Sequence, residues 1–239
     1  MITPEEYFAP NPHLRPPRPC PELWTPPAPC RGLRKISPRS KGSTHGHIVV
    51  DNVRVDFESR LEKFTALVFR ARPDTAAIVE QTPRVTYVDD DGVVCNHVCD
   101  LRVTRTDGFR TAILVKPSIR VVSSGIERVR DLLAEQMSPD DADGVLLFTE
   151  KQMTRADRFN GEWMLAACNH SDPDDDAIVA NLIERMDGET CIEDLVRRSG
   201  LHGFGFRALT RAIADGRLRL TKHCMITRDA FVVRNTNVD

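Results

Sequence analysis

Residues 56–117 decide the fold, because three clusters of polar residues lie there within regular apolar patterns. The first, Asp56-Phe57-Glu58-Ser59-Arg60-Leu61-Glu62, opens a segment whose apolar residues recur at helical spacing as far as Ala71. The second, Asn96-His97-Val98-Cys99-Asp100, lies in an alternating strand. The third, Ile113-Leu114-Val115-Lys116-Pro117, is an apolar strand that ends on a lysine. The pattern therefore predicts an acid on a helix, an acid on a strand and a lysine on another strand.

Turn-forming residues divide the region after this helix into three consecutive strands, expected over 78–88, 93–104 and 111–116. The run Asp89-Asp90-Asp91-Gly92 marks the first turn, and Arg105-Thr106-Asp107-Gly108 marks the second. Antiparallel pairing of the last two strands would bring Asp100 and Lys116 together.

The flanking segments complete an α/β domain, which we expect over 47–170. Residues 47–55 predict a short strand or hairpin, and 124–137 predict a helix. The apolar run 144–148 predicts a buried strand, and 154–167 predict another helix. The run Asp172-Pro173-Asp174-Asp175-Asp176 is typical of a hinge or linker, and we expect Asp174, Asp175 and Asp176 in a solvated loop.

The last segment, 171–239, predicts three helices and a β-hairpin, which together describe a winged helix. The helices are expected over 177–186, 192–198 and 206–215, and the strands over 216–220 and 230–233. In that architecture the third helix and the wing would carry basic side chains toward DNA: Arg207, Arg211, Arg217, Arg219 and Lys222. From Asp176 onward ten Lys/Arg face nine Asp/Glu, which is a weak electrostatic case. Protein docking is therefore the alternative role for this segment.

Residues 1–46 form a proline-rich arm that holds 11 of the 16 prolines, so helices and sheets are not expected there. The arm either wraps a neighbouring surface, orders on binding a partner or DNA, or is a disordered tail. The formal net charge of −2 indicates no general affinity for nucleic acid. No apolar run reaches the roughly 18–20 residues that span a bilayer, and the N-terminus lacks a signal pattern. We therefore expect a cytoplasmic protein without a membrane partner.

The three polar clusters have a chemical logic, because phosphodiester hydrolysis needs an activated water and a neutralised phosphate charge. Carboxylates that hold Mg²⁺ serve both needs, and a nearby lysine stabilises the developing charge. The alternative for Glu58 and Glu62 is structural, since residues one turn apart form the solvated side of an amphipathic helix. Cys95-x-His97-x-Cys99 suggests zinc, but no second half-site follows, which favours packed, reduced thiols.

A series of further motifs occurs in a fixed order around these clusters. The motifs are Gly46-His47-Ile48-Val49-Val50, Phe57-Glu58-Ser59-x-x-Glu62, Glu80-Gln81-x-Pro83, Tyr87 before the Asp-Gly turn, His97-x-x-Asp100 and Val115-Lys116-Pro117. This series resembles the N-terminal nuclease domain of the TnsA-type transposon endonucleases. That family is a branch of the restriction-endonuclease-like PD-(D/E)xK fold, with a mixed sheet flanked by helices. Its members carry a C-terminal winged-helix-like domain, in agreement with the separate interpretation of 171–239.

The resemblance implies roles for individual residues. Glu62 matches the helix carboxylate and Asp100 the strand carboxylate, both as ligands of Mg²⁺ or Mn²⁺, and Lys116 matches the catalytic lysine. Gln81, Pro83 and His97 match family signature positions, and the role of Gln81 and Pro83 is expected to be structural. Family members cut double-stranded DNA at transposon 5′ ends and act with a DDE-type transposase and an ATPase regulator, which are therefore the implied partners.

Two positions depart from the family pattern. Cys99 stands where proline usually precedes the aspartate, and Leu114 stands where Glu or Gln is expected two residues before the lysine. Leucine offers no oxygen to a metal. The Val115 carbonyl would then have to join Glu62 and Asp100 as the third ligand.

Three other interpretations stay open. A substitute acid, Glu127 or Glu58, could complete the site. The site could instead be inactive, leaving a DNA-binding or assembly scaffold of the same fold. Finally, the chain could be a two-domain DNA-binding regulator unrelated to transposition. Fold alone does not separate these functions, because chemistry depends on the site.

Overall fold

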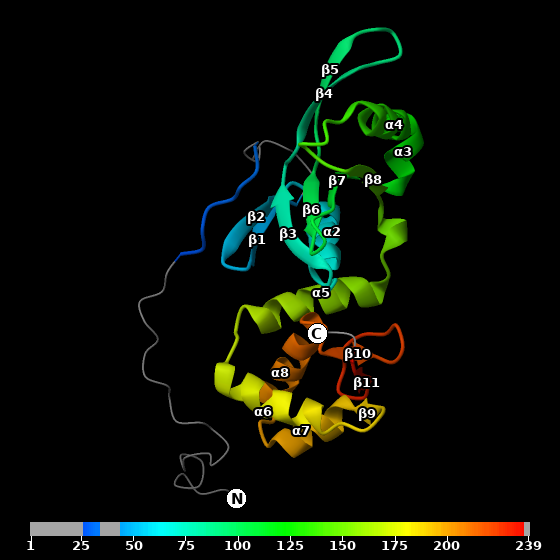
Figure 1. Ribbon diagram of the computed structural model, residues 1–239. Coiled ribbons are helices and arrows are strands. Elements are labelled where there is room, and N and C mark those ends of the chain that lie inside the picture. The colour runs from blue at the N-terminus through cyan, green and yellow to red at the C-terminus, as the bar shows by residue number, and fades with distance from the viewer. Residues whose placement is uncertain (1–25, 34–43, 237–239) are drawn as a thin grey trace, which may run out of the picture.

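The central sheet has four strands in the order β3-β6-β7-β8, and helices lie on both of its faces (Figure 1). It belongs to a computed structural model that describes residues 26–33 and 44–236. The strands are β3 (Thr75–Glu80), β6 (Leu101–Arg105), β7 (Arg110–Val115) and β8 (Gly144–Phe148). The first three are antiparallel neighbours, and β8 runs parallel to β7. The prediction of a mixed sheet flanked by helices in an α/β chain is confirmed.

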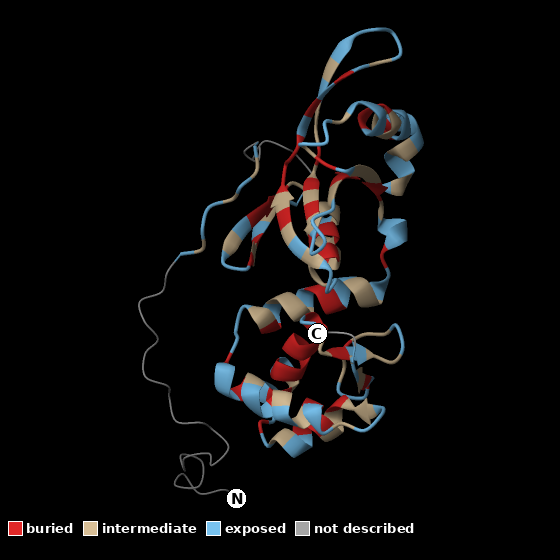
Figure 2. Cartoon of the chain, viewed as in Figure 1, coloured by how far each residue is buried: buried red, intermediate tan, exposed pale blue. Residues whose placement is uncertain are grey.

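Each face of the sheet has its own apolar core. Ile113 and Val115 pack with α2 (Arg60–Arg70) on one face, whereas Leu114 packs on the other face with α4 (Ile126–Gln136). This division follows from the alternation of side chains along a strand. Figure 2 shows the resulting band of buried residues through the sheet and α2. The strand β7 is buried on both faces, which explains its continuous apolar sequence.

Two of the predicted strands are each divided by an irregular segment. The segment 78–88 becomes the end of β3 followed by β4 (Arg84–Val88), and Gln81 between them has a positive φ of 47°. The segment 93–104 becomes β5 (Val94–Val98) and β6, divided at Cys99 and Asp100. The hairpin β4–β5 forms a separate two-stranded ribbon that projects beyond the central sheet (Figure 1).

The remaining N-terminal elements agree with the predicted ones, with shifted ends. Residues 47–55 form the hairpin of β1 (Gly46–Val50) and β2 (Val53–Phe57). The helix predicted over 124–137 is α4, and a separate helix, α3 (Ser118–Ser124), precedes it. The left-handed φ of 62° at Gly125 divides the two helices. A short 3-10 turn, η1 (Glu150–Gln152), follows β8.

The helix α5 (Arg155–Cys168) packs against both α2 and α8 (Gly203–Ala214), so it joins the two parts of the chain (Figure 1). Gly161 allows the close approach to α2, because a Cβ there would lie 3.0 Å from the Leu67 Cβ. On the other side the Trp163 indole donates to Thr210 at 2.9 Å. The predicted boundary at 170 falls just after this shared helix.

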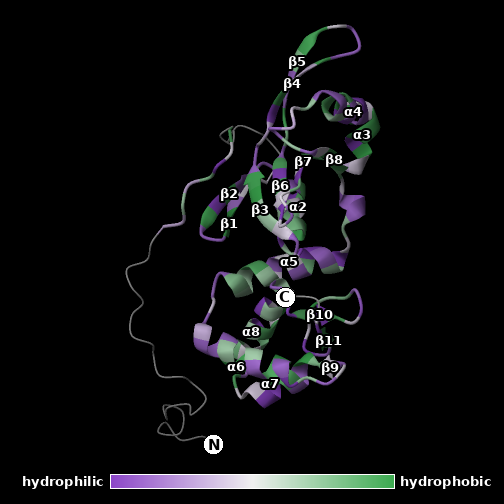
Figure 3. Ribbon diagram, in the orientation of Figure 1, coloured by the Kyte–Doolittle hydropathy of each residue, from purple (hydrophilic) through white to green (hydrophobic). Residues whose placement is uncertain are grey.

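The C-terminal part contains the three predicted helices and the predicted hairpin, with one additional short strand. The elements are α6 (Pro173–Glu184), β9 (Thr190–Cys191), α7 (Ile192–Ser199), α8, β10 (Leu218–Leu220) and β11 (Phe231–Arg234). The strands form an antiparallel sheet in the order β10-β11-β9. Figure 3 shows hydrophobic and hydrophilic residues alternating along these helices, as expected where one face packs inward.

The prediction of a solvated loop at Asp174, Asp175 and Asp176 is wrong. Asp172 caps α6 by accepting from the Asp174 amide, and the three acids occupy the first turn of that helix. Acids are favourable there because the N-terminus of a helix is partially positive. Asp175 is buried, and Asp176 forms an ion pair with Arg211 at 2.7 Å.

The described part of the proline-rich arm lies along the N-terminal hairpin. Ala28 bridges to β2, donating to the Asn52 carbonyl at 2.8 Å and accepting from the Arg54 amide at 2.9 Å. The Leu33 amide reaches the Gln81 carbonyl at 3.3 Å. The rest of the arm, 1–25 and 34–43, lies outside the described residues, as does 237–239. In the part of the chain that the structure describes, no helix is long and apolar enough to cross a membrane.

Candidate functional site

The topology brings Glu62, Asp100 and Lys116 to the same end of the central sheet. The four-residue connection 71–74 makes α2 run antiparallel to β3, so the start of α2 lies near the end of β3. Leu101 at the start of β6 pairs with Glu80 at the end of β3 and with Ile113 near the end of β7. Glu62 therefore comes from the start of α2, Asp100 directly precedes β6, and Lys116 directly follows β7.

Glu62 has a structural task, because its side chain supports the Ser59 N-cap at the start of α2. Its carboxylate accepts from the Glu58 amide at 2.8 Å and from the Ser59 hydroxyl at 2.8 Å. The Ser59 hydroxyl in turn accepts from the Glu62 amide at 3.1 Å. Ser59 thereby satisfies the Glu62 amide, one of the amides that the first turn of a helix leaves without partners. A ligand at Glu62 would compete with the cap.

Asp100 is held by the backbone of both neighbouring strands. Its Oδ2 atom accepts from the Val115 amide at 2.7 Å, and its own amide donates to the Ile113 carbonyl at 3.0 Å. Its carbonyl accepts from the Gln81 amide at 2.7 Å. The carboxylate is thereby fixed beside the end of β7.

Leu114 is part of the protein core. It is 1% exposed and belongs to the apolar cluster that includes Ile126, Leu132 and Leu133 of α4. A Glu or Gln at this position would place a polar group among those side chains, where burial without a hydrogen-bond partner costs free energy. Leu114 is therefore matched by apolar packing around it.

Lys116 is half-buried at the end of β7, and its amide donates to the Phe148 carbonyl at 3.0 Å. Within 26–33 and 44–236, no carboxylate lies at ion-pair distance from its ammonium group. The predicted pairing of β6 and β7 is confirmed as antiparallel, and it forms no Asp100–Lys116 ion pair.

A carboxylate that the sequence analysis did not single out contacts the segment just after Lys116. Glu150, after β8, accepts from the Ser118 amide at 2.9 Å and from the Ser118 hydroxyl. These hydrogen bonds from Ser118 lower the pKa of Glu150. The signal is the parallel pairing of β7 and β8, which brings the segments after both strands together. The contact between Glu150 and Ser118 cannot be predicted from a sequence whose strand pairing is unknown.

The two proposed substitute acids are placed differently. Glu58 precedes the cap of α2 and is half-buried, whereas Glu127 is exposed in the first turn of α4. The whole of α3 separates Glu127 from Lys116 along the chain.

The residues present do not form a prepared Mg²⁺ site. Among the described residues, no group of three His, Cys, Asp or Glu side chains is arranged to hold a metal ion. Leu114 offers no oxygen, and both oxygens of the Glu62 carboxylate accept hydrogen bonds in the cap. Mg²⁺ demands hard oxygen ligands in near-octahedral geometry, so the set Glu62, Asp100 and Val115 does not meet that demand as it stands.

The zinc alternative at Cys95, His97 and Cys99 is likewise without a metal-holding group among the described residues. Cys99 is fully buried, and burial raises the pKa of its thiol to about 12, so it stays protonated. Only the thiolate is a good metal ligand.

Gln81 and Pro83, two of the signature positions, shape the chain beside the site. Gln81 is 2% exposed with a positive φ, and its amide holds the Asp100 carbonyl. The Pro83 carbonyl accepts from the Cys99 amide at 2.9 Å. His97, the third signature residue, pairs with Val85 in the β4–β5 ribbon.

The basic residues predicted to bind DNA are not all available to it. Arg207, Arg219 and Lys222 are exposed. Arg217 is half-buried, and its guanidinium lies 3.2 Å from the Asp215 carboxylate. Arg211 is 4% exposed, so the prediction that it reaches DNA is wrong. The physical reason is that its guanidinium joins three segments, donating to Asp176 and to the carbonyls of Ala167 and His170.

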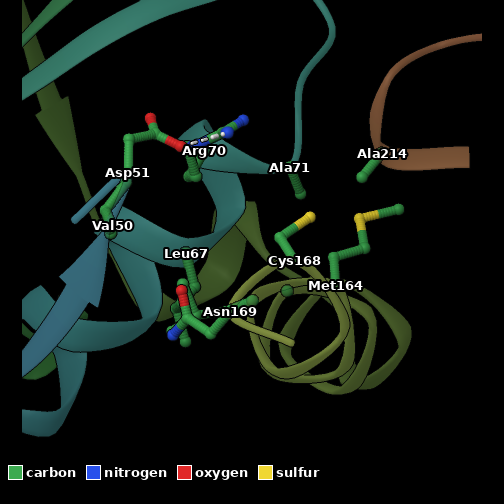
Figure 4. Close-up of a pocket in the computed structure, with 11 residues that line it drawn as sticks. Val50, Asp51, Leu67, Arg70, Ala71, Met164, Cys168, Asn169 and Ala214 are labelled. Carbon is green, nitrogen blue, oxygen red and sulfur yellow. Dashed lines mark hydrogen bonds and ion pairs between the residues drawn. The ribbon is translucent and has the colours of Figure 1, made fainter. Parts of the chain in front are cut away.

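A small cavity lies between the two parts of the chain. Its volume is about 20 Å³, room for roughly one water. Figure 4 shows Leu67, Met164, Cys168 and Ala214 around it, with Arg70 and Asp51 paired at 2.8 Å at one side. It is a packing gap where α2, α5 and the end of α8 meet.

Comparison of the chain with family models and with curated proteins finds no match.

Proposed function

We propose that this chain is a DNA-acting protein with the restriction-endonuclease-like fold of the TnsA-type endonucleases, in which cutting is impaired. Its role in this proposal is to bind DNA and to support assembly of a transposition complex. The observation that carries the proposal is Leu114, which fills the position of a metal-binding Glu or Gln with a side chain that is 1% exposed. The capping role of Glu62 supports the same conclusion.

The order of elements supports the fold part of this proposal. The helix α2 precedes three antiparallel strands, and α4 then leads to β8, parallel to β7. Glu62, Asp100 and Lys116 come from segments that meet at one end of the sheet, which supports a common role for them in this proposal. In the C-terminal part, three helices with a three-stranded sheet support a winged helix. A DDE-type transposase, an ATPase regulator and a cytoplasmic location belong to the proposal through the resemblance.

A second candidate function is the metal-dependent DNA endonuclease itself. Lys116 favours it, because its ammonium group has no carboxylate partner among the described residues and is available to a phosphate. In that case Asp100, positioned by the Val115 amide, would lie beside the phosphate as well. The Mg²⁺ or Mn²⁺ ion would supply the activated water, and substrate binding would have to complete its ligands.

A cleavage assay separates the two candidates. Supercoiled plasmid and DNA with transposon ends are incubated with Mg²⁺ or Mn²⁺, with the wild type, Asp100→Ala and Lys116→Ala. We expect DNA binding by all three proteins, weakened in Lys116→Ala, and no metal-dependent nicking. Nicking by the wild type that both variants lose would establish the endonuclease instead. Absence of DNA binding would reject both candidates.

A further inference from the structure

We propose that the outer faces of α2 and α5 form a surface that binds the phosphate backbone of duplex DNA. The inference rests on the proposed function and adds the place of contact, which differs from the basic residues predicted in the C-terminal part. The surface, called here the Phe64 patch, consists of Phe64 with Arg60, Lys63, Arg155 and Arg158.

Three cations gather around one aromatic ring in this patch. The guanidinium carbon of Arg60 lies 5.9 Å from the centre of the Phe64 ring, and that of Arg158 also lies 5.9 Å away. The Lys63 ammonium lies 5.4 Å from the same centre. A cation within about 6 Å of an aromatic ring is attracted to it, so Phe64 holds these groups together. The three side chains come from two helices that pack against each other.

The carboxylates nearest the patch, those of Glu62, Asp157 and Glu162, are each held in hydrogen bonds or ion pairs. Glu162 pairs with Lys63 at 2.6 Å, and Asp157 is engaged with Thr154 and with His223 at 3.4 Å. Arg60, Arg155 and Arg158 are exposed, and none of them pairs with a carboxylate in the described part of the chain. Arg155 lies three residues before Arg158 on α5 and so shares its face.

Clustered like charges raise the free energy of the unbound protein, and a polyanion relieves that repulsion. Phosphates of duplex DNA are closely spaced along the backbone, and several cations on one surface release several counterions when they bind it. Phe64 supplies an apolar platform beneath the cations, but the contacts carry no base information. The patch therefore predicts binding without sequence preference.

The patch also adjoins the candidate site. Glu62, at the start of α2, stands between Arg60 and Lys63 in the sequence and at the same end of the sheet as Asp100 and Lys116. A duplex held on the patch would thus lie beside that end of the sheet. Of the five basic residues predicted to bind DNA in the C-terminal part, Arg211 is buried and Arg217 is paired with Asp215.

The test measures binding of a fluorescent duplex by anisotropy over a range of about 50 to 200 mM salt. We expect the double variant Arg60→Ala/Arg158→Ala to bind more weakly and to lower the slope of log K against log salt by about two, one for each lost phosphate contact. Glu162→Gln removes the acid beside Lys63, so we expect it to bind DNA more tightly than the wild type. Tighter binding is a result that a structural role for Glu162 would not produce.

Arg72→Ala is the matched control. Arg72 is also exposed and also lies over an aromatic ring, 4.6 Å from the centre of Phe69, but at the other end of α2. We expect the slope of log K against log salt to be the same for Arg72→Ala as for the wild type. Thermal unfolding of each variant verifies that the fold is retained.

Two results would overturn the inference, and they differ in what they say of the function. In the first result, the patch variants bind DNA like Arg72→Ala, whereas Arg207→Ala/Arg219→Ala shows a smaller slope of log K against log salt. DNA binding would then be retained, and its surface would lie in the C-terminal part. If the wild type binds no duplex at low salt, the proposed function and the patch both fail. An acidic protein surface would then be the partner to seek for the patch.

Discussion

Single residues decide whether the end of the central sheet is a site for chemistry or part of the core. Leu114 belongs to the core, since it is 1% exposed among the side chains that α4 contributes. Asp100 and Lys116 flank it and keep polar contacts with the backbone. Leu114 is therefore part of the packing of α4 against the sheet and offers no oxygen to a metal.

Leu114→Ala should destabilise the fold by about 2–5 kcal/mol, because truncation of a buried leucine loses apolar burial and leaves a cavity. Urea unfolding followed by circular dichroism measures the change in unfolding free energy. Val122→Ala is the control, because Val122 is 87% exposed and its truncation should change stability little. A small loss at Leu114 would mean that this side chain is not packed as described.

Cys99 predicts a pH dependence of stability at alkaline pH. Burial raises the pKa of its folded-state thiol to about 12, above the 9.0 of an ordinary thiol. The unfolded chain therefore releases this proton first as the pH rises, so stability should fall from about pH 9 toward pH 12. Unfolding free energies measured across that range should decline less steeply in Cys99→Ala. Equal slopes in both proteins would contradict the assignment.

At the scale of elements, the start of α2 depends on a reciprocal cap. Ser59→Ala should cost about 1 kcal/mol, the usual value for loss of an N-cap. Glu62→Ala should also destabilise, and the double variant should lose less than the sum, because both changes remove the hydrogen bond between the Ser59 and Glu62 side chains. Strictly additive losses in urea unfolding would show that Glu62 does not act through the cap.

The contact between α2 and α5 depends on a glycine. In Gly161→Ala the new Cβ would meet the backbone carbon and oxygen of Leu67 at 3.2 Å, and the backbone of a packed helix cannot easily move away. Overpacking costs about 1–3 kcal/mol, more than alanine gains in a helix. Gly203→Ala is the matched control, since nothing lies within 4 Å there, and it should leave the melting temperature unchanged or slightly raised.

At the scale of the whole molecule, Arg211 ties α8 to α6 and to the end of α5. Its guanidinium pairs with Asp176 at 2.7 Å, and it also donates to the Ala167 and His170 carbonyls. Arg211→Met should cost about 3–5 kcal/mol, because it leaves a partly buried carboxylate without its partner. Arg217→Met removes the more exposed pair with Asp215 and should cost at most about 1 kcal/mol. Similar losses in both variants would contradict this difference.

Sequence alone predicted much of the element order, and its errors have identifiable causes. Apolar periodicity located α2, α5, α7 and the strands, because burial of one face imposes that spacing. The division of the strands at Gln81 and at Asp100 was missed, since neither the positive φ at Gln81 nor the two irregular residues Cys99 and Asp100 leave a periodic signal. Asp175 and Arg211 were expected in solvent because charge alone does not reveal which partner a distant helix supplies.

The sequence by itself determined the α/β class, the order of helices and strands, and the absence of a third acid two residues before Lys116. These properties are local, since spacing and residue type along the chain specify them. Tertiary structure decided that Glu150 lies beside Ser118 and that cations from two helices meet at Phe64. Those properties depend on contacts between segments up to about a hundred residues apart, which the packing of the core brings together and which no local pattern encodes.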